Sequence, residues 1–289
     1  MTLLVLGANG QLGGDLMAAA ARSGMAATGA GREAVDVADP GALRAYLEAT
    51  PFDVLVNCAA LLNTEAIEGD PGPALAVNAH APAIMAEVAA AKGARLVQIS
   101  TDYVFGGDAA RRAPLAEDAP PAPVNVYGLS KLYGETLARL AGGDVTVFRV
   151  ASTFGVRGAS GKGGNFVETM IRVGGSRGAL TVVADQIMSP TSTAWAAQAI
   201  LTFLERRGAP GVYHAVNGGA VSWFDFARAI VARAGVKASV APCKAADWPS
   251  RARRPAWSAL DNARLAAVIG PIPGWEDALD AYLAAKGHV

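Results

Sequence analysis

A tyrosine and a lysine stand four residues apart in the segment "NVYGLSK", as Tyr127 and Lys131. The segment reads as the start of a helix, so the two side chains lie on one face, about one turn apart. A phenol can donate a hydrogen bond and then a proton to an oxygen that gains charge when hydride reaches a carbonyl. Its unperturbed pKa of about 10 is high for this task, and a nearby lysine ammonium lowers it. Such pairs also occur on ordinary amphipathic helices, so the pair alone leaves catalysis open.

Polar residues end the strand that precedes this helix. "RLVQIS" reads as a buried strand and is followed by "TDYVF", which puts Ser100, Thr101 and Asp102 at its carboxyl end. In a doubly wound sheet, ligands bind at the carboxyl ends of the strands. The Thr101 hydroxyl could therefore polarise the same carbonyl that Tyr127 protonates.

Gly7, Gly10 and Gly13 lie between the first strand and the first helix, in "LLVLGANGQLG". A dinucleotide loop needs residues without a Cβ here, because the backbone must approach a pyrophosphate closely and the helix N-terminus offers its N–H groups. The spacing predicts such a loop, although a tight turn without a ligand would use the same glycines.

The segment after the second strand should recognise the adenosine ribose, about 20 residues beyond the glycines. It reads "GAGREAVDV", in which Arg32 stands beside Glu33 and no acid directly follows the strand. An arginine here can pair with a 2′-phosphate. We therefore expect NADPH as the cofactor, bound more tightly than NADH, which remains possible. A solvated loop arginine is the alternative.

Short apolar runs alternate with longer amphipathic ones, from "LLVLG" to "DVTVFRV". This order predicts the α/β class, with a Rossmann-type doubly wound parallel sheet covered by helices on both faces. We expect residues 1–156 to form the dinucleotide-binding domain, joined by returning strands near 180–216, "LTVV" and "GVYHAV". Residues 157–179 and 217–289 are expected to form a smaller C-terminal substrate-binding lobe.

Charge and cysteine content argue against several classes of function. The 289 residues include 25 basic and 25 acidic side chains, so nothing indicates binding to nucleic acid or to an anionic membrane. Two cysteines and three scattered histidines form no disulfide framework and no metal-site pattern. We find no signal-peptide pattern and no apolar run of spanning length, and we expect a cytoplasmic protein without a metal.

Six segments carry a resemblance to a known family: "GANGQLG", "VNCAA", "STDYVF", "NVYGLSK", "NFVETMIR" and "RRPAWSALD". In this order they resemble the extended short-chain dehydrogenase/reductases, specifically the dTDP-4-dehydrorhamnose reductase group, over nearly the whole chain. The resemblance implies an NAD(P)H-dependent oxidoreductase of deoxysugar biosynthesis. It would reduce the 4-keto group of a nucleoside-diphosphate deoxyhexose, and a homodimer is possible.

Residue roles follow from the same resemblance. Thr101, Tyr127 and Lys131 would be the catalytic triad, and Lys131 would also hold the nicotinamide ribose. The cofactor would contact the glycine loop, the residues after the second and third strands and two polar side chains, namely Gly7, Gly10, Gln11, Leu12, Gly13, Arg32, Asp36, Val37, Cys58, Ala59, Ala60, Asn78 and Ser100. The nucleotide sugar would contact Asp102, Tyr103, Ser152, Asn165, Phe166 and Arg254.

Three segments depart from the usual pattern of the group. Leu61 and Leu62 stand where an aromatic residue or histidine and then a threonine are usual, and Ser152 replaces a tryptophan thought to pack on the sugar. These departures leave the identity of the sugar open. The connection "RGASGKGGNF" is longer than usual and carries Arg157 and Lys162, which could reach a diphosphate or remain solvated.

Two other functions fit the same motifs. One is a cofactor-binding regulatory subunit that resembles the β-subunit of methionine adenosyltransferase. The other is a sister enzyme, an epimerase or dehydratase that recycles its bound nicotinamide. Dehydratases usually carry an aspartate and a glutamate after the threonine, whereas Asp102 and Tyr103 follow Thr101 here, which argues against dehydration.

Overall fold

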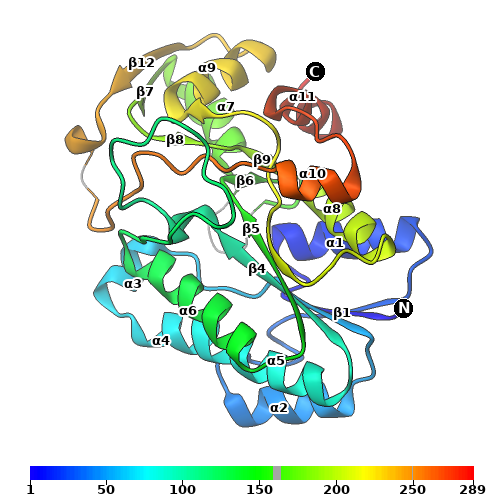
Figure 1. The fold of residues 1–289 in the computed structure, drawn as a ribbon. Helices are drawn as coiled ribbons and strands as arrows, with labels where there is room; N and C mark the ends of the chain where they lie inside the picture. Colours follow the sequence, from blue (N-terminus) through cyan, green and yellow to red (C-terminus); the bar gives the residue numbers. More distant parts are fainter. Residues whose placement is uncertain (159–163, 249) are drawn as a thin grey trace.

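Six parallel strands form the central sheet of the protein in a computed structural model, which describes residues 1–158, 164–248 and 250–289. In spatial order they are β10 (Gly211–His214), β5 (Asp144–Val150), β4 (Arg95–Thr101), β3 (Val54–Asn57), β1 (Leu3–Leu6) and β2 (Ala27–Ala30) (Figure 1). All neighbours pair in parallel, which confirms the predicted α/β class. The strand order reverses between β1 and β3, which is where such sheets bind ligands.

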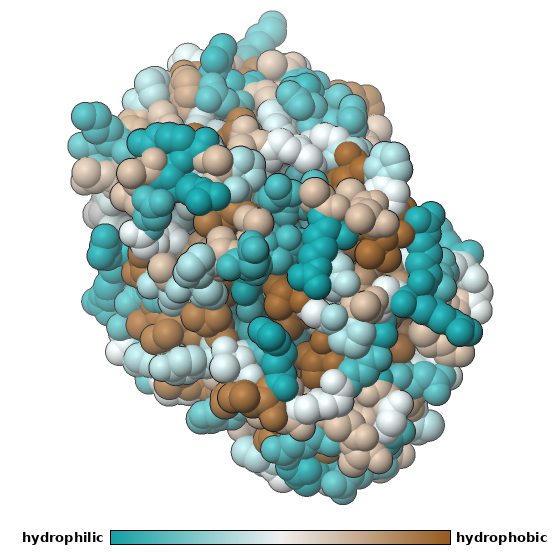
Figure 2. Space-filling model, in the orientation of Figure 1, coloured by the Kyte–Doolittle hydropathy of each residue, from teal (hydrophilic) through white to brown (hydrophobic). Residues whose placement is uncertain are grey.

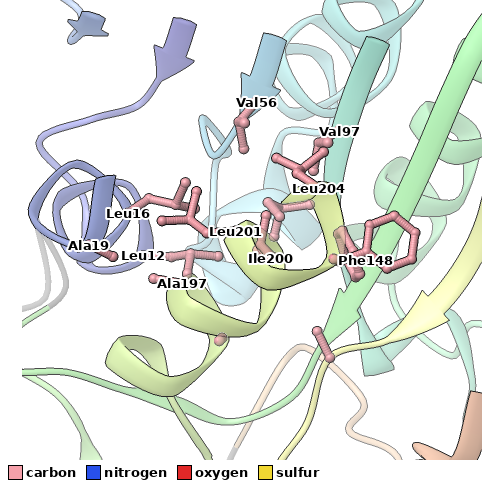
Figure 3. Close-up of a cluster of buried hydrophobic side chains, with 14 of the residues drawn as sticks. Leu12, Leu16, Ala19, Val56, Val97, Phe148, Ala197, Ile200, Leu201 and Leu204 are labelled. Atoms are coloured by element: carbon pink, nitrogen blue, oxygen red, sulfur yellow. The ribbon is translucent and has the colours of Figure 1, made fainter. Parts of the chain in front are cut away.

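Helices cover both faces of this sheet. One face carries α1 (Gln11–Arg22), α8 (Thr193–Glu205) and α10 (Ala263–Ile269), and the other carries α2 (Pro40–Ala49), α5 (Ala81–Ala91) and α6 (Val126–Leu140). Their apolar stripes bury the sheet on both sides. Figure 3 shows α1 and α8 meeting the strands through Leu12, Leu16, Ala19, Ala197, Ile200, Leu201 and Leu204, against Val56, Val97 and Phe148.

One helix runs without a break from Gly72 to Ala91, through α4 (Gly72–Leu75), a π-helical turn η1 (Ala76–His80) and α5. Among the described residues it is the one helix long and apolar enough to cross a membrane, with 20 residues and a mean hydropathy of 1.3. The expectation that no apolar run reaches this length is therefore wrong. More than half of the segment, 56%, is buried inside the protein, as in the core helix of a folded domain.

On the outer face shown in Figure 2, hydrophobic residues lie scattered between hydrophilic ones.

The second lobe is assembled from separate pieces of the chain. Three helices, α7 (Phe166–Arg177), α9 (Trp223–Arg233) and α11 (Trp275–Lys286), pack around one apolar core. Three two-stranded sheets accompany them: β7 (Ala179–Val183) with β12 (Ser239–Cys243), β8 (Ile187–Met188) with β11 (Val221–Ser222), and β6 (Thr153–Phe154) with β9 (Thr191–Ser192). Short helices α3 (Thr64–Gly69), η2 (Asp102–Val104) and η3 (Ala245–Asp247) lie in the connections.

Only one of the two strands predicted to return to the central sheet does so. β10 pairs with β5, whereas β7 pairs with β12 outside the sheet, so the expectation for "LTVV" is wrong. The reason is that Leu180 and Val182 of β7 are buried in the core of the second lobe. α10 also differs from expectation, because Leu265 packs in the sheet core although its segment was assigned to the substrate lobe.

Candidate active site

The start of α6 touches the turn that follows β4. The Asn125 side chain caps the helix by accepting a hydrogen bond of 2.7 Å from the Gly128 N–H. A Cβ on Gly128 would fall 2.1 Å from the Tyr103 carbonyl oxygen, so only glycine permits this approach. The contact brings Tyr127, in the first turn of α6, to Thr101 at the end of β4.

The Tyr127 phenol lies close enough to the Thr101 hydroxyl for a hydrogen-bond interaction to affect its pKa. The Tyr103 ring stands edge-on to the Tyr127 ring, with 5.8 Å between the centroids. Burial raises the pKa of the Tyr127 phenol, the hydrogen bond with Thr101 opposes this, and the nearby Asp102 raises it further. The phenol therefore keeps its proton at neutral pH and is available as a donor.

Lys131 lies one turn further along α6 and is 3% exposed. Its Nζ donates a hydrogen bond of 2.7 Å to the Ile99 carbonyl of β4. Burial lowers the pKa of the ammonium to about 8, while Glu135 acts in the opposite direction. The expectation that Lys131 lowers the pKa of Tyr127 is not met, because burial dominates at the phenol and the ammonium is bonded to the strand backbone.

Asp102 is buried between the two lobes, with 2% exposure. Its Oδ2 accepts a hydrogen bond of 2.6 Å from Ser258, and its Oδ1 accepts one of 3.1 Å from Thr101. Burial raises the pKa of the carboxyl to about 6, although both hydrogen bonds lower it. The structure thus gives Asp102, predicted as a substrate contact, the task of positioning Thr101.

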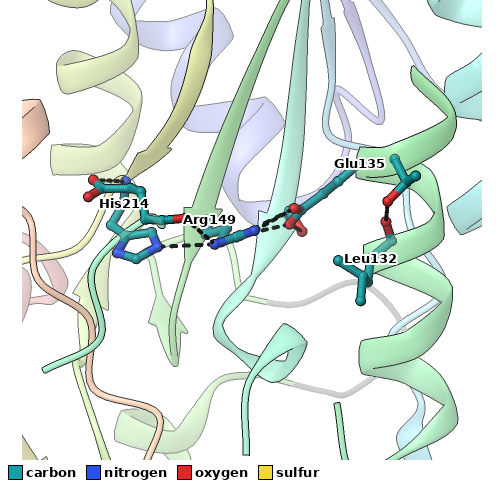
Figure 4. A network of polar contacts seen from close by, with 7 residues as sticks. Leu132, Glu135, Arg149 and His214 are labelled. Atoms are coloured by element: carbon teal, nitrogen blue, oxygen red, sulfur yellow. Dashed lines mark hydrogen bonds and ion pairs between the residues drawn. The ribbon is translucent and has the colours of Figure 1, made fainter. Parts of the chain in front are cut away.

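A buried ion pair joins Glu135 of α6 to Arg149 of β5, as Figure 4 shows. Arg149 Nη2 and Glu135 Oε2 are 2.8 Å apart, and Arg149 Nη1 lies 3.5 Å from His214 Nε2. Burial and the arginine charge lower the pKa of His214 to about 3, so the imidazole is neutral. Ser100, predicted as a cofactor contact, donates its hydroxyl to Glu135 instead. Sequence reasoning missed this network, because its members come from four separate elements: β4, β5, β10 and α6.

The glycine loop packs closely on the end of β3. Gly7 has a φ of +73°, and a Cβ there would fall 2.7 Å from the Ala59 nitrogen. A Cβ on Gly13 would fall 2.3 Å from the Gly7 carbonyl oxygen. Both positions need glycine, as a dinucleotide loop does. Gln11 Oε1 in the same loop is buried without a hydrogen-bond partner among the described residues, which fits a loop that a cofactor completes.

Residues after β3 border this loop. The Cys58 carbonyl carbon lies close enough to Gly7 to block a side chain there, and burial raises the pKa of the Cys58 thiol to about 12. Asn78, in the π-helical turn, accepts a hydrogen bond of 2.9 Å from the Leu61 N–H and donates one of 3.1 Å to Ser130 Oγ. Asn78, predicted as a cofactor contact, therefore braces the segment after β3 against α6.

The predicted ribose end of the site carries charges of both signs. Arg32 is 84% exposed and pairs with Asp36 at 2.9 Å. Hydrogen bonds from the Ala38 N–H and then from Arg32 hold the pKa of Asp36 below its usual value. Val37 packs against the core on that face of the sheet. No acid directly follows β2 in the sequence, but the Glu33 carboxylate bends back toward the strand end and lies beside Gly31.

A cavity of about 710 Å³ opens in the second lobe. Phe166, Trp223 and Trp248 give it aromatic walls, and Arg254 contributes a cation. Apolar and aromatic walls with a few placed charges are typical of small-molecule sites. Two of the predicted substrate contacts, Phe166 and Arg254, therefore share one cavity.

Arg254 links this cavity to the catalytic residues. It is hydrogen-bonded to Tyr103, whose pKa burial raises to about 12. Glu65 of α3 holds the segment before Arg254, because its carboxylate accepts hydrogen bonds from Ser250 Oγ and from the Arg251 N–H at 2.8 Å. Glu65 also lies 4.0 Å from the Arg254 guanidinium. Sequence reasoning did not find Glu65, which lies far from this segment in the chain.

The other predicted substrate contacts have different surroundings. Asn165 caps α7 by accepting a hydrogen bond of 3.1 Å from the Glu168 N–H, and it donates to Gly155 and Tyr282. Ser152 has a φ of +43°, which is uncommon for a residue with a Cβ.

The long connection after β6 is only partly described. A Cβ on Gly14 would fall 2.5 Å from Cδ of Arg157, so Arg157 lies across the first turns of α1. Lys162 lies outside the described residues. Arg157 thus lies on the dinucleotide side, beside the glycine loop.

Known proteins are similar to this sequence along nearly its whole length. The profile of the RmlD substrate binding domain family matches residues 1–287. The chain belongs to this family. A dTDP-4-dehydrorhamnose reductase from Mycolicibacterium smegmatis is 38% identical over 98% of this chain and 85% of its own. A probable dTDP-4,6-dihydroxy-2-methyloxan-3-one 4-ketoreductase from Streptomyces antibioticus is 36% identical over 96% of this chain and 91% of its own.

The fold of this RmlD-family chain matches a solved structure equally well. A dTDP-4-dehydrorhamnose reductase from Bacillus anthracis, in complex with NADP, gives a TM-score of 0.90 at 31% identity, over 99% of this chain and 100% of that one. These relatives confirm the predicted family, an oxidoreductase rather than a regulatory subunit or an epimerase, and the Bacillus anthracis relative binds NADP. In the part of the chain that the structure describes, no three His, Cys, Asp or Glu side chains group to hold a metal ion.

Proposed function

We propose that this protein reduces the 4-keto group of a dTDP-linked deoxyhexose with NADPH, as a step of deoxysugar biosynthesis. The observation that carries the proposal is the juxtaposition of the Tyr127 and Thr101 hydroxyls at the carboxyl end of β4, with Lys131 buried one helical turn further on. The pair lies in a chain of a reductase family whose curated members carry that activity in their names.

NADPH, when bound, supplies the hydride. The chain supplies the rest: the Thr101 and Tyr127 hydroxyls donate hydrogen bonds to the carbonyl oxygen, and Tyr127 passes its proton to that oxygen as negative charge develops. The raised pKa of the phenol keeps the proton in place until then. A proton from solvent then restores the phenol.

The cofactor would lie on the glycine loop. The loop from Gly7 to Gly13, with the N-terminus of α1, suits the pyrophosphate, and the unpartnered Gln11 oxygen suits a ligand donor there. Cys58 and the two alanines after it would border the cofactor, and Arg32 is available for the 2′-phosphate once it leaves Asp36.

The nucleotide part of the substrate would occupy the cavity of the second lobe. Its aromatic walls suit a base, and Arg254 suits a diphosphate, since a guanidinium binds phosphate oxygens in pairs. The hexose would then lie between Arg254 and Tyr127. Leu61 and Leu62 are 37% and 42% exposed, and they stand where the family resemblance implies an aromatic residue or histidine and then a threonine. We therefore propose a relaxed sugar preference.

The test is NADPH oxidation by the purified protein, with a panel of 4-keto nucleotide sugars that varies the hexose and the base. We expect turnover of dTDP-4-dehydrorhamnose and of at least one other dTDP-4-keto hexose. The product is identified by mass spectrometry, and reactions without sugar give the background. NADPH binding without turnover of any 4-keto sugar would falsify the proposal and favour a regulatory subunit.

We also propose a cytoplasmic homodimer. The curated relatives are reductases of a nucleotide sugar by name, which supports the location. Tyr133 and Leu140 of α6 are 49% and 77% exposed, and this apolar helix face supports the dimer. Cell fractionation and light scattering of the purified protein test the two statements separately.

A further inference from the structure

The Asn9 and Glu33 side chains meet over the backbone of Gly31. Asn9 Nδ2 donates to the two Glu33 carboxylate oxygens, at 3.3 and 3.2 Å. A Cβ on Gly31 would fall 2.3 Å from Asn9 Nδ2 and 2.4 Å from the Glu33 carboxylate oxygens. The bridge therefore lies directly on the strand end, and it depends on glycine at position 31.

This bridge joins the two segments that surround the adenosine ribose in dinucleotide folds. Asn9 belongs to the glycine loop, and Glu33 follows β2, the strand beside β1. The Gly7 and Ala8 N–H groups both donate to the Ala30 carbonyl, at 2.9 and 3.3 Å, which fixes the loop against β2. The residue after β2 reads the ribose 2′ position, where a carboxylate suits a hydroxyl and an arginine suits a phosphate.

Both kinds of side chain stand here side by side. Arg32 is 84% exposed and paired with Asp36, so it is free to turn only by giving up that ion pair. Glu33 is exposed and holds its carboxylate at the strand end through Asn9. A 2′-phosphate carries close to two negative charges and would meet this carboxylate, whereas a 2′-hydroxyl can donate a hydrogen bond to it.

We propose that Glu33, held by Asn9 over Gly31, is a specificity-determining residue that opposes the 2′-phosphate of NADPH and accepts the 2′-hydroxyl of NADH. Arg32 acts in the opposite sense, so Glu33 reduces the preference for NADPH that Arg32 would otherwise give. NADPH binding requires Glu33 to leave Asn9, whose amide then becomes a donor to the phosphate. The inference rests on the proposed cofactor site and adds the residue that sets its preference.

The test uses two probes that differ only in the 2′-phosphate: AMP, which lacks it, and adenosine 2′,5′-bisphosphate, which carries it. Dissociation constants are measured by calorimetry for the unmutated protein, Glu33→Gln, Arg32→Ala and a control, Glu48→Gln. The control removes the same charge from an exposed position on α2. NADPH and NADH are titrated in parallel by fluorescence, and thermal unfolding checks that each variant folds.

Glu33→Gln should bind the bisphosphate roughly five- to tenfold more tightly, with AMP affinity unchanged or slightly weaker. The gain should shrink as salt rises, because the charges are exposed. Arg32→Ala should weaken the bisphosphate alone, and Glu48→Gln should change neither probe. An unchanged bisphosphate constant in Glu33→Gln, with normal binding by the unmutated protein, overturns this inference and leaves the reductase proposal standing. If the unmutated protein binds neither the probes nor the cofactors, both proposals fail.

Discussion

The Ser258 hydroxyl donates a hydrogen bond of 2.6 Å to the Asp102 carboxylate, which also accepts one of 3.1 Å from Thr101. Ser258 comes from the arginine-rich segment of the second lobe, and Asp102 follows Thr101 at the end of β4. One buried carboxylate thus joins the two lobes and orients a hydroxyl of the proposed active site. The protonation of Asp102 should therefore affect both stability and catalysis.

Asp102 should make the protein less stable as pH rises from about 4 to about 7. Its pKa is raised from 3.8 to about 6 in the folded state, so the folded protein holds this proton more tightly than the unfolded chain. The resulting stabilisation is fully present below the unfolded pKa and is lost as pH rises through about 6, on the order of 3 kcal/mol. Asp102→Asn should remove this step from the free energy of unfolding, measured in urea across this pH range.

The control for this experiment is Asp277→Asn, which changes an exposed carboxylate at the start of α11. It should keep the pH dependence of the unmutated protein. If Asp102→Asn shows the same pH dependence as the control, Asp102 is not the group responsible.

Arg254→Ala should weaken binding of the nucleotide sugar and leave binding of NADPH unchanged. Arg254 lines the cavity of the second lobe and is hydrogen-bonded to Tyr103. A hydrogen bond from a charged group contributes about 1.5–3 kcal/mol, so KM for the sugar nucleotide should rise roughly ten- to a hundredfold. Steady-state kinetics and the NADPH dissociation constant check this together. Arg177→Ala, at the exposed end of α7, is the matched control. An equal loss of affinity for the nucleotide sugar and for NADPH would mean that Arg254 has a structural role and does not bind the substrate.

Removing one partner of the buried pair of Glu135 and Arg149 should strongly lower the free energy of unfolding. Removing both charges should lower it less. Both side chains are almost fully buried, with 3% and 4% exposure, so Arg149→Met leaves an uncompensated carboxylate. Such a change costs about 3–5 kcal/mol of stability, whereas an apolar replacement of both partners is often tolerated. Urea unfolding of Arg149→Met, Glu135→Leu and the double variant measures this. Additive losses in the double variant would show that the two charges do not depend on each other.

Much of the fold was predictable, because its signals are local. Apolar runs such as "LLVLG" and "DVTVFRV" became β1 and β5, and the glycines of the first loop occupy positions where a Cβ would collide with backbone. The placement of Thr101 at the site followed from its position at the carboxyl end of β4, whereas its pairing with Tyr127 was implied by the family resemblance. The failure at "LTVV" has a physical reason: β7 found a partner in β12, a strand some 60 residues later that no local pattern announces.

The partners of the site residues were not predictable in the same way. Glu65 supports the segment before Arg254 from α3, and Ser258 reaches Asp102 from the other lobe. Asn9 and Glu33 are 24 residues apart and meet only because Gly31 leaves room above the strand. Such contacts depend on how elements pack, which composition and spacing do not encode.

Tyr127→Phe should abolish turnover and leave cofactor binding intact. The change removes only the hydroxyl and keeps the ring against Tyr103. Loss of a general acid lowers kcat by a factor on the order of 10² or more. Because the ring is kept, NADPH should still bind with an unchanged dissociation constant. Thr101→Ala should act in the same direction but more mildly. A Tyr127→Phe variant with normal kcat would show that another group delivers the proton.

Lys131 should make NADPH binding depend on pH near 8. Burial lowers the pKa of its ammonium to about 8, so the charge is present below this value and is lost as pH rises through it. If the ammonium holds the nicotinamide ribose, the NADPH dissociation constant should increase between about pH 7 and pH 9. Lys131→Met keeps the length of the side chain, and it should bind NADPH weakly at every pH, with a flat profile. Fluorescence titrations of both proteins across this range measure the effect. A profile in Lys131→Met that still bends near pH 8 would mean that another group titrates there, and that Lys131 serves only through its hydrogen bond to the Ile99 carbonyl.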